Sequence, residues 1–498
     1  MNLSQDICEL LKEMGPGHMT NTAYDTAWIA RLGELDEPIS NRALDWLSTN
    51  QLPDGSWGAQ ELFYYHDRVI CTLAAIIALT KHGKRYHDHT QRERGIVALE
   101  RLTSGATRGL MADPGGSTVG FEMIMPTLLA EAQNMGIIKN QDNHILGRLS
   151  RKRATKIAML EGKMINRQVT MAHSAEMAGP DAMHLLDIDN LQEKNGSIAS
   201  NPAATAYFAI QVRPGDTKAL NYLHNVIVDD GAPYLSPFDI YERAWVLWNL
   251  ALAAPFDKSV MAVFRPHLDY LEGAWQPGEG VSFSVDFAPK DGDDTCISYE
   301  LLSRFGYSVD LAAVLSYEEV DHFRCFALEA NPSISVNIHM LGALKQAGLE
   351  LKDPPVQKIL RFLKNTQIST TFWFDKWHAS PYYATSHAVI ACSGYADELV
   401  KTAVEWILET QLRDGSWGFF PGMPTAEETA YCLQALALWQ RSGHSLPNNT
   451  LQRGKKWLTD HMTENYPPLW PGKCLYCPDL IVRSAILSAL ALVDTADK

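Results

Sequence analysis

The sequence predicts an all-α protein that consists of two α/α barrels, each built from helical hairpins. The first observation is an internal repeat, because the segment ALDWLSTNQLPDGSWG at 43–58 recurs 360 positions later as AVEWILETQLRDGSWG at 403–418. The second is that apolar residues recur at helical spacing between such segments, as in 67–82 and 425–442. Runs with strict alternation of apolar and polar residues are scarce. Since the two strong copies lie far apart, we expect one in each barrel.

Each copy of the repeat reads as a short amphipathic helix that ends in an aromatic residue, a Gln and a Gly-containing turn closed by a second Trp. Weaker copies occur at 191–200, 361–373 and 455–470. In the C-terminal part the aromatic residues are separated by 44 and then 51 residues, which suits one helical hairpin per repeat. We expect the Trp and Gln side chains to fasten the hairpin turns, a structural role that needs no contact with a ligand.

Composition limits the classes of function. Of the 498 residues, 46% are hydrophobic and 20% are charged, which is typical of a globular protein with two or three domains. The formal net charge is -15, so we expect no general affinity for nucleic acid, because binding to phosphates needs clustered Lys and Arg.

We expect neither a secretory leader nor a transmembrane segment. The first residues include Asp6, Glu9 and Glu13, and the most apolar stretches, near 71–80 and 484–493, are too short to span a bilayer. Eight cysteines are scattered along the chain, with one CxxC pair at 474–477. A single such pair is weak support for a metal or redox site, so we interpret the cysteines as reduced thiols and expect a cytoplasmic location.

Three carboxylates, those of Asp291, Asp293 and Asp294, fall within four residues, just before a helical pattern that begins near Thr295. Three structural interpretations are open. Asp294 could be a helix N-cap, the cluster could lie in a solvated loop, or it could resemble a calcium site, although the usual ligand spacing is missing. Crowded carboxylates cannot all ionise together, so one of them keeps a proton at neutral pH. In an apolar, aromatic cavity such a group could protonate an alkene, and aromatic rings would stabilise the carbocation.

Several motifs in a fixed order resemble those of the class II terpene cyclases, over nearly the whole chain. Within that family, the sequence is most similar to the two-barrel bacterial diterpene cyclases that make copalyl, halimadienyl (tuberculosinyl) or clerodienyl diphosphate. The motifs are TAYDTAW at 22–28, the first QxxDGSWG at 51–58, VGFE at 119–122 with Pro126, DGDDT at 291–295, NPS at 331–333 with Asn337, and DKW at 375–377.

The resemblance implies a β domain and a γ domain with the active site between them. It assigns 1–32 as the N-terminal helix of the β domain, 33–230 as an inserted γ domain, and 231–498 as the β domain that carries the DxDD motif.

The resemblance also implies roles for the acidic motif. Asp293, the middle carboxylate, is expected to be the general acid. Asp291 and Asp294 are expected to polarise and orient it. Asn337 is expected to hold the acidic proton in position through a hydrogen bond.

Further residues are expected by resemblance to handle the diphosphate and to quench the final cation. Glu122 resembles a residue that binds Mg²⁺ and diphosphate, Lys376 resembles a diphosphate contact, and Lys156, in a basic run, is a further candidate. Plant ent-copalyl enzymes quench the cation with water held by a His–Asn pair. Here His173 matches the His, and Tyr234 stands at the position of the Asn. A Trp often found ahead of the acidic motif is replaced by Phe283.

These expectations describe an intramolecular lyase or isomerase that cyclises geranylgeranyl diphosphate after protonation and keeps the diphosphate. The sequence has no DDxxD run with the accompanying Asn/Ser/Glu triad, so we expect a separate enzyme to consume the product. Three alternatives remain. They are a drimenyl-type cyclase of farnesyl diphosphate, a squalene–hopene-like cyclase of a polyprenyl substrate without diphosphate, and a non-catalytic helical-barrel binding module. The last would leave the three carboxylates unexplained, while Glu122 and Lys376 speak against the second.

Overall fold

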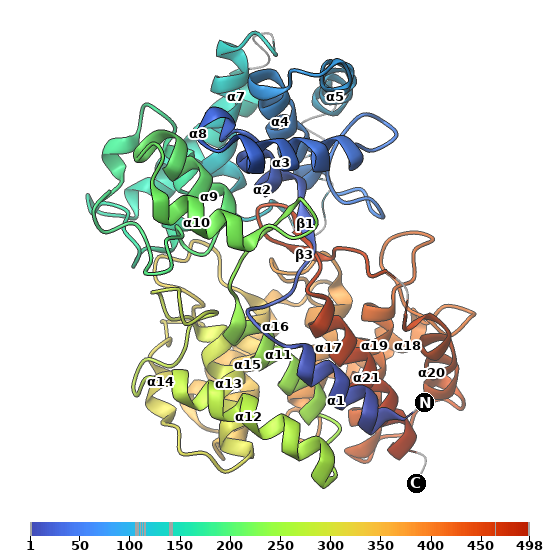
Figure 1. Cartoon of the computed structure of the whole chain (residues 1–498). Helices are drawn as coiled ribbons and strands as arrows, with labels where there is room; N and C mark the ends of the chain where they lie inside the picture. The colour runs from blue at the N-terminus through green and yellow to red at the C-terminus, as the bar shows by residue number, and fades with distance from the viewer. Residues whose placement is uncertain are drawn as a thin grey trace.

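The computed structural model describes residues 2–104, 109, 111, 113, 116–138, 143–463 and 465–496. It has two helical bodies, one above the other in Figure 1, and both are α/α barrels, as predicted. In the described part of the chain, no helix is long and apolar enough to cross a membrane.

The C-terminal barrel has an inner ring in which each helix contacts the next and the last contacts the first. These inner helices are α11 (Asp239–Ala251), α13 (Gly292–Arg304), α15 (Ile334–Gln346), α17 (Pro381–Cys392), α19 (Ala426–Arg441) and α21 (Asp479–Ala496). The outer helices that pack on them are α1 (Leu3–Glu13), α12 (Lys258–Ala274), α14 (Leu311–Leu315), α16 (Pro354–Thr366), α18 (Asp397–Glu409) and α20 (Thr450–His461).

The sequence accounts for the two layers. Every residue of the inner helix α17 is buried, and the helix contains no Lys, Arg, Asp or Glu that would need contact with solvent. The outer helix α16 buries only Val356, Ile359 and Leu363, which recur at helical spacing on one face.

The N-terminal barrel follows the same plan around a smaller ring. Its inner members are α2 (Ala23–Ala30), α4 (Tyr65–His82), α7 (Phe121–Asn134), the 3-10 segment η2 (Thr170–Ala178) and α9 (Pro202–Tyr207). Packed outside them are α3 (Glu37–Thr49), α5 (Tyr86–Ser104), α8 (Asn143–Ala158) and α10 (Thr217–Val226), with short 3-10 or π turns η1 (Gly33–Leu35), η3 (Met183–Leu185) and η4 (Phe208–Val212).

The repeated Trp and Gln residues fasten the hairpin turns, which confirms the structural prediction. Gln411 Nε2 donates to the carbonyl oxygens of Gly415 and Thr450, and Trp417 Nε1 donates to the carbonyl of Ile407 at 2.7 Å. The N-terminal copy repeats this arrangement, since Gln51 and Trp57 make the equivalent bonds. Each turn therefore satisfies carbonyl groups that a helix end leaves without a partner.

The expected division of the chain needs one correction. We expected residues 1–32 to join the C-terminal barrel, but only α1 does so, and in Figure 1 it lies against α21. All of α2 is buried, and it packs against α3, α4 and α9 of the N-terminal barrel. The chain thus crosses between the barrels before residue 23.

Two small antiparallel pairings lie where the barrels meet. Strand β1 (Asn21–Thr22) pairs with β2 (Ala232–Pro233), so both crossings of the chain are joined. Strand β3 (Trp470–Pro471) pairs with β4 (Leu475–Tyr476), and the turn between them reaches into the N-terminal barrel.

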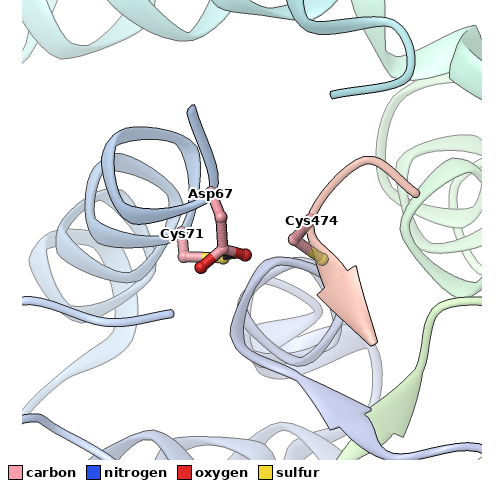
Figure 2. A group of neighbouring side chains, drawn as sticks. All are labelled: Asp67, Cys71 and Cys474. Carbon is pink, nitrogen blue, oxygen red and sulfur yellow. Dashed lines mark hydrogen bonds between the residues drawn. The ribbon is translucent and has the colours of Figure 1, made fainter. Parts of the chain in front are cut away.

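That turn meets α4 through Asp67, Cys71 and Cys474, whose ligand atoms all lie within 4.8 Å of one another (Figure 2). Both carboxylate oxygens of Asp67 already accept backbone N–H groups at 2.8 Å, from Ala59 and Leu475. Burial raises the pKa of both thiols. Cys474 therefore faces α4 rather than forming a metal or redox site with the second cysteine of its CxxC pair, and we interpret the cluster as hydrogen-bonded packing between the barrels.

Candidate active site

A cavity of about 580 Å³ lies between the barrels and takes residues from both. Its volume is within the range of small-molecule sites. Aromatic side chains of the C-terminal barrel form much of the wall: Phe238, Tyr241, Trp245, Phe283, Phe287, Phe326, Trp377, Tyr383, Trp470 and Tyr476. Phe283, at the position where a Trp was expected, stacks on Phe287 with ring centroids 4.2 Å apart.

The acidic motif stands at the start of α13, on the wall of this cavity. The helix begins at Gly292, three residues before the expected start, because the N-cap is Asp291 rather than Asp294. Asp291 Oδ1 accepts the backbone N–H of Asp294 at 2.8 Å. All three acidic residues line the cavity.

Burial keeps a proton on this cluster at neutral pH. Burial, reinforced by the charge of Asp293, raises the pKa of Asp291 to about 7. Burial and the neighbouring Asp291 raise the pKa of Asp294 well above its ordinary value. Oδ2 of Asp291 and Oδ1 of Asp294 are buried without a hydrogen-bond partner in the described chain. The three side chains together therefore carry fewer than three negative charges.

Asp293 has the more open side chain, with 14% of its surface exposed, and it lines the cavity. Its Oδ1 lies 2.6 Å from Nδ1 of His339, a buried residue of α15. Its other oxygen makes no hydrogen bond to the described residues. The geometry thus separates Asp293 from the other two carboxylates.

The prediction for Asn337 is wrong. Its amide closes a loop, accepting from the backbone N–H of Phe323 at 2.8 Å and donating to the carbonyl oxygens of Phe323 and Ser333. His339, two residues later, takes the expected position instead, because residues two apart on a helix point to different sides. Sequence reasoning missed this His, whose only signal was a titratable side chain between the apolar residues Ile338 and Met340 of α15.

His173 and Tyr234, the two residues expected to quench the final cation, are in contact. Nε2 of His173 lies 2.7 Å from the Tyr234 hydroxyl, and both residues line the cavity. Burial, together with the charge of Lys473, lowers the pKa of His173 well below its ordinary value. His173 is therefore a neutral imidazole. Tyr234 in turn stacks on Tyr476 of β4 at 5.2 Å.

A buried ion pair under this site was not predicted. Lys473, in the turn after β3, donates to Glu176 Oε1 at 2.5 Å and to Asn201 Oδ1 at 2.7 Å. Tyr24, from the TAYDTAW motif, donates to the same Glu176 oxygen at 2.9 Å. The motif near the N-terminus thus serves to hold the two barrels together beside His173.

Glu122 and Lys156 form an ion pair on the N-terminal wall of the cavity, with Nζ and Oε1 2.8 Å apart. Glu122 lies in the first turn of α7, and Lys152 lines the same wall. Burial, the largest single influence, raises the pKa of Glu122, but the charge and hydrogen bond of Lys156, with smaller contributions from a backbone hydrogen bond and Lys152, together leave that pKa below its ordinary value. The wall thus presents an ionised carboxylate between ammonium groups.

Lys376, the expected diphosphate contact, lines the cavity from the C-terminal barrel. It donates to the carbonyl oxygen of Asn331 at 2.6 Å and pairs with Glu329, a residue that sequence reasoning missed. The other oxygen of Glu329 accepts the backbone N–H of Cys325 at 2.8 Å. Glu329 therefore anchors the ammonium group of Lys376 at the cavity.

The N-terminal wall offers one carboxylate, that of Glu122, of the kind that can hold a magnesium ion. Mg²⁺ is commonly held by one or two carboxylates, with phosphate oxygens and water completing its shell. Glu122 supplies one ionised carboxylate at the cavity, and the two lysines beside it suit an anionic partner of the ion.

Comparisons with known proteins show which family the chain belongs to. A family model of the squalene-hopene cyclase C-terminal domain matches residues 318–466. A type B diterpene cyclase of Mycobacterium tuberculosis is 47% identical over 485 residues, which cover 96% of this chain and 97% of that protein. Ent-copalyl diphosphate synthase 1 of Oryza sativa subsp. japonica is 27% identical over 99% of this chain and 56% of its own length.

Among solved structures, ent-copalyl diphosphate synthase from Streptomyces platensis superposes with a TM-score of 0.79 and 28% identity, over 99% of this chain and 100% of that one. The similarities confirm the family that the motifs indicated. With an aromatic cavity, a proton-holding acidic cluster and full-length likeness to a cyclase, this chain belongs to the class II diterpene cyclases.

Proposed function

We propose that the enzyme converts geranylgeranyl diphosphate to a bicyclic diterpenyl diphosphate of the halimadienyl, copalyl or clerodienyl type. The observation that carries the proposal is the hydrogen bond of Asp293 to His339 on the wall of an aromatic cavity that also holds Lys156 and Lys376. A carboxylic acid can protonate an alkene, and the ammonium groups of the two lysines can bind a diphosphate.

Asp293 starts the reaction by giving its carboxyl proton to the terminal alkene of the bound substrate. The alkene π electrons form the new C–H bond, Asp293 becomes a carboxylate, and a tertiary carbocation remains on the substrate. Further alkenes attack this cation in turn and close the rings. The faces of Trp245, Tyr241 and Tyr383 at the cavity stabilise the positive charge while excluding water.

Removal of a proton from the final cation ends the reaction. His173 is a neutral base at the cavity wall, and its Nε2 shares a hydrogen bond with Tyr234. Either residue can take a proton directly or orient a water molecule. We propose this pair as the terminal base.

The diphosphate is retained and held by cationic groups. We propose that Lys376 and Lys156 bind its oxygens and that Glu122 holds Mg²⁺ with it. When bound, the ion supplies positive charge that neutralises the diphosphate. Since the product keeps this group, a separate enzyme that ionises diphosphates must consume it. The eight free cysteines support our proposal that the enzyme works in the cytoplasm.

Direct assay of the purified protein tests the function. Geranylgeranyl diphosphate, farnesyl diphosphate and squalene are incubated separately with enzyme and Mg²⁺, dephosphorylated where needed, and analysed by gas chromatography–mass spectrometry. The expected result is a bicyclic C20 alcohol from geranylgeranyl diphosphate, with little turnover of the other two. A product from farnesyl diphosphate or squalene alone would refute the proposed substrate.

A further inference from the structure

Two imidazoles form a chain behind the proposed acid. Nδ1 of His339 lies 2.6 Å from Oδ1 of Asp293, and Nε2 of the same ring lies 2.8 Å from Nδ1 of His387. The three residues stand on α13, α15 and α17, which are consecutive inner helices of the C-terminal barrel. Nε2 of His387, at the end of the chain, is buried without a partner in the described residues.

His387 is enclosed by aromatic rings. Ring centroids of Tyr383, Trp248 and Tyr431 lie 4.4, 4.9 and 5.2 Å from its own. Burial, and the nearby His339 and His378, lower the pKa of His387 well below its ordinary value. His387 is thus a neutral ring with a single N–H proton, which lies either on Nδ1 or on Nε2.

Only two arrangements of protons satisfy both hydrogen bonds of this chain while the rings stay neutral. In the first, His387 donates from Nδ1 to His339, and His339 donates from Nδ1 to Oδ1 of Asp293. The acidic proton of Asp293 must then sit on Oδ2, the oxygen that has no partner in the described protein.

In the second arrangement every donor is reversed. Asp293 donates from Oδ1 to His339, and His339 donates from Nε2 to His387. The acidic proton then points into the protein rather than toward a substrate. Nε2 of His387 has no partner in either arrangement, as a bare nitrogen in the first and as an N–H group in the second. Only the first arrangement therefore leaves the acidic proton on the oxygen that a substrate can reach.

We propose that His387 is a positioning residue for proton donation, which selects the tautomer of His339 and thereby presents the acidic proton of Asp293 on Oδ2. It does so by donating from Nδ1 to Nε2 of His339. The inference rests on the proposed protonation by Asp293 and adds a residue that does not itself line the cavity.

Two substitutions separate hydrogen bonding from packing. His387→Phe keeps an aromatic ring in the aromatic enclosure and removes both nitrogens. His387→Asn removes the ring but keeps an amide N–H near the position of Nδ1. His387→Leu replaces the Phe variant if that one does not fold, as judged by circular dichroism and thermal unfolding.

We expect His387→Phe to lower kcat by about 100-fold or more, the size of effect typical for general acid catalysis, with KM changed less than about threefold. His387→Asn should stay within about tenfold of the wild type. The solvent deuterium isotope effect on kcat should rise in the Phe variant, because proton transfer becomes rate-limiting. If His387 served only in packing, kcat would not fall in the Phe variant while staying near the wild-type value in the Asn variant.

Three results would overturn the inference: normal kcat in the Phe variant, equal losses in the Phe and Asn variants, or greater loss in Asn than in Phe. Asp293→Asn is measured beside them. If that variant remains active, the proposed function itself fails. If it is inactive while His387→Phe is normal, only the role of His387 is refuted.

Discussion

Nδ1 of His339 lies 2.6 Å from Oδ1 of Asp293, and this bond distinguishes Asp293 from the two carboxylates beside it. Asp291 is committed to capping α13, and Asp294 is buried against Asp291. Asp293 alone of the three has one oxygen held by an imidazole and the other left for the cavity. The geometry therefore supports the proposal that Asp293 is the acid, as does its position in the motif.

Asp293→Asn should abolish cyclisation while leaving the fold intact. The amide keeps the size of the carboxyl group and can still bond to His339, but it has no acidic proton to give. We expect kcat to fall by more than the ~10²–10⁴ typical of assisted proton transfer, because this transfer starts the reaction. Thermal unfolding should be unchanged within a few degrees. Turnover near the wild-type rate would remove Asp293 from the role.

Asp291→Asn should make the protein more stable at alkaline pH and less active. The folded-state pKa of Asp291, about 7, lies above its ordinary value of 3.8, so its effect on stability is most favourable at low pH and is lost as pH rises from about 4 to about 7. Asn still caps the helix but carries no charge to bury.

We therefore expect Asp291→Asn to raise Tm by about 2–4 °C at pH 8 and by less at pH 5. Scanning calorimetry at both pH values measures this difference. An equal shift at both pH values would show that ionisation of this carboxyl does not oppose folding.

Glu122→Gln should weaken the handling of the diphosphate. The amide cannot carry the negative charge that we propose holds Mg²⁺, and it leaves Lys156 without its ionic partner. We expect KM for geranylgeranyl diphosphate to rise about tenfold, the Mg²⁺ optimum to shift, and the skeleton of the product to stay the same. If chelator has no effect on the wild type and Glu122→Gln behaves normally, the magnesium proposal fails.

Lys473→Met should destabilise the junction of the barrels. Lys473 and Glu176 are fully buried, and removal of one partner leaves an uncompensated charge, which costs about 3–5 kcal/mol. The double variant Lys473→Met/Glu176→Gln should recover part of this loss. Urea unfolding of the single and double variants measures both effects. Equal stability of the single variant and the wild type would show that the pair is dispensable.

The fold could be predicted because its signals are local. The Gln, the Gly turn and the Trp of each repeat lie within a few residues, and their hydrogen bonds close the turn in which they occur. The acidic cluster could be predicted for the same reason, since its members are contiguous. The place of α2 could not, because a continuous chain does not show at which residue it crosses between barrels.

The rest of the site depends on contacts between distant segments. His339 meets a residue 46 positions away, and Lys473 meets one 297 positions away. Resemblance to a family supplied a position near His339 but not the direction of its side chain, so the hydrogen bond to Asp293 that we expected of Asn337 is made by the residue two places later. Direction on a helix changes with every residue, which a motif without a structure does not resolve.

The last prediction concerns the identity of the product. The lifetime of the cation depends on where a base or an ordered water lies, and the bond of 2.7 Å between His173 and Tyr234 places two candidate acceptors together on the cavity wall. His173→Phe removes the neutral imidazole without adding charge, so we expect a new ratio of products, with more rearranged or hydroxylated diphosphates, rather than simple loss of activity. Tyr234→Phe should give a smaller change of the same kind, because the imidazole remains.

Chromatographic profiles of the dephosphorylated products from both variants and the wild type measure the effect. Unchanged profiles and rates would assign the pair to packing and leave the terminal base elsewhere, while the role of Asp293 would stand, because the proton is given before any ring closes and taken only after the last.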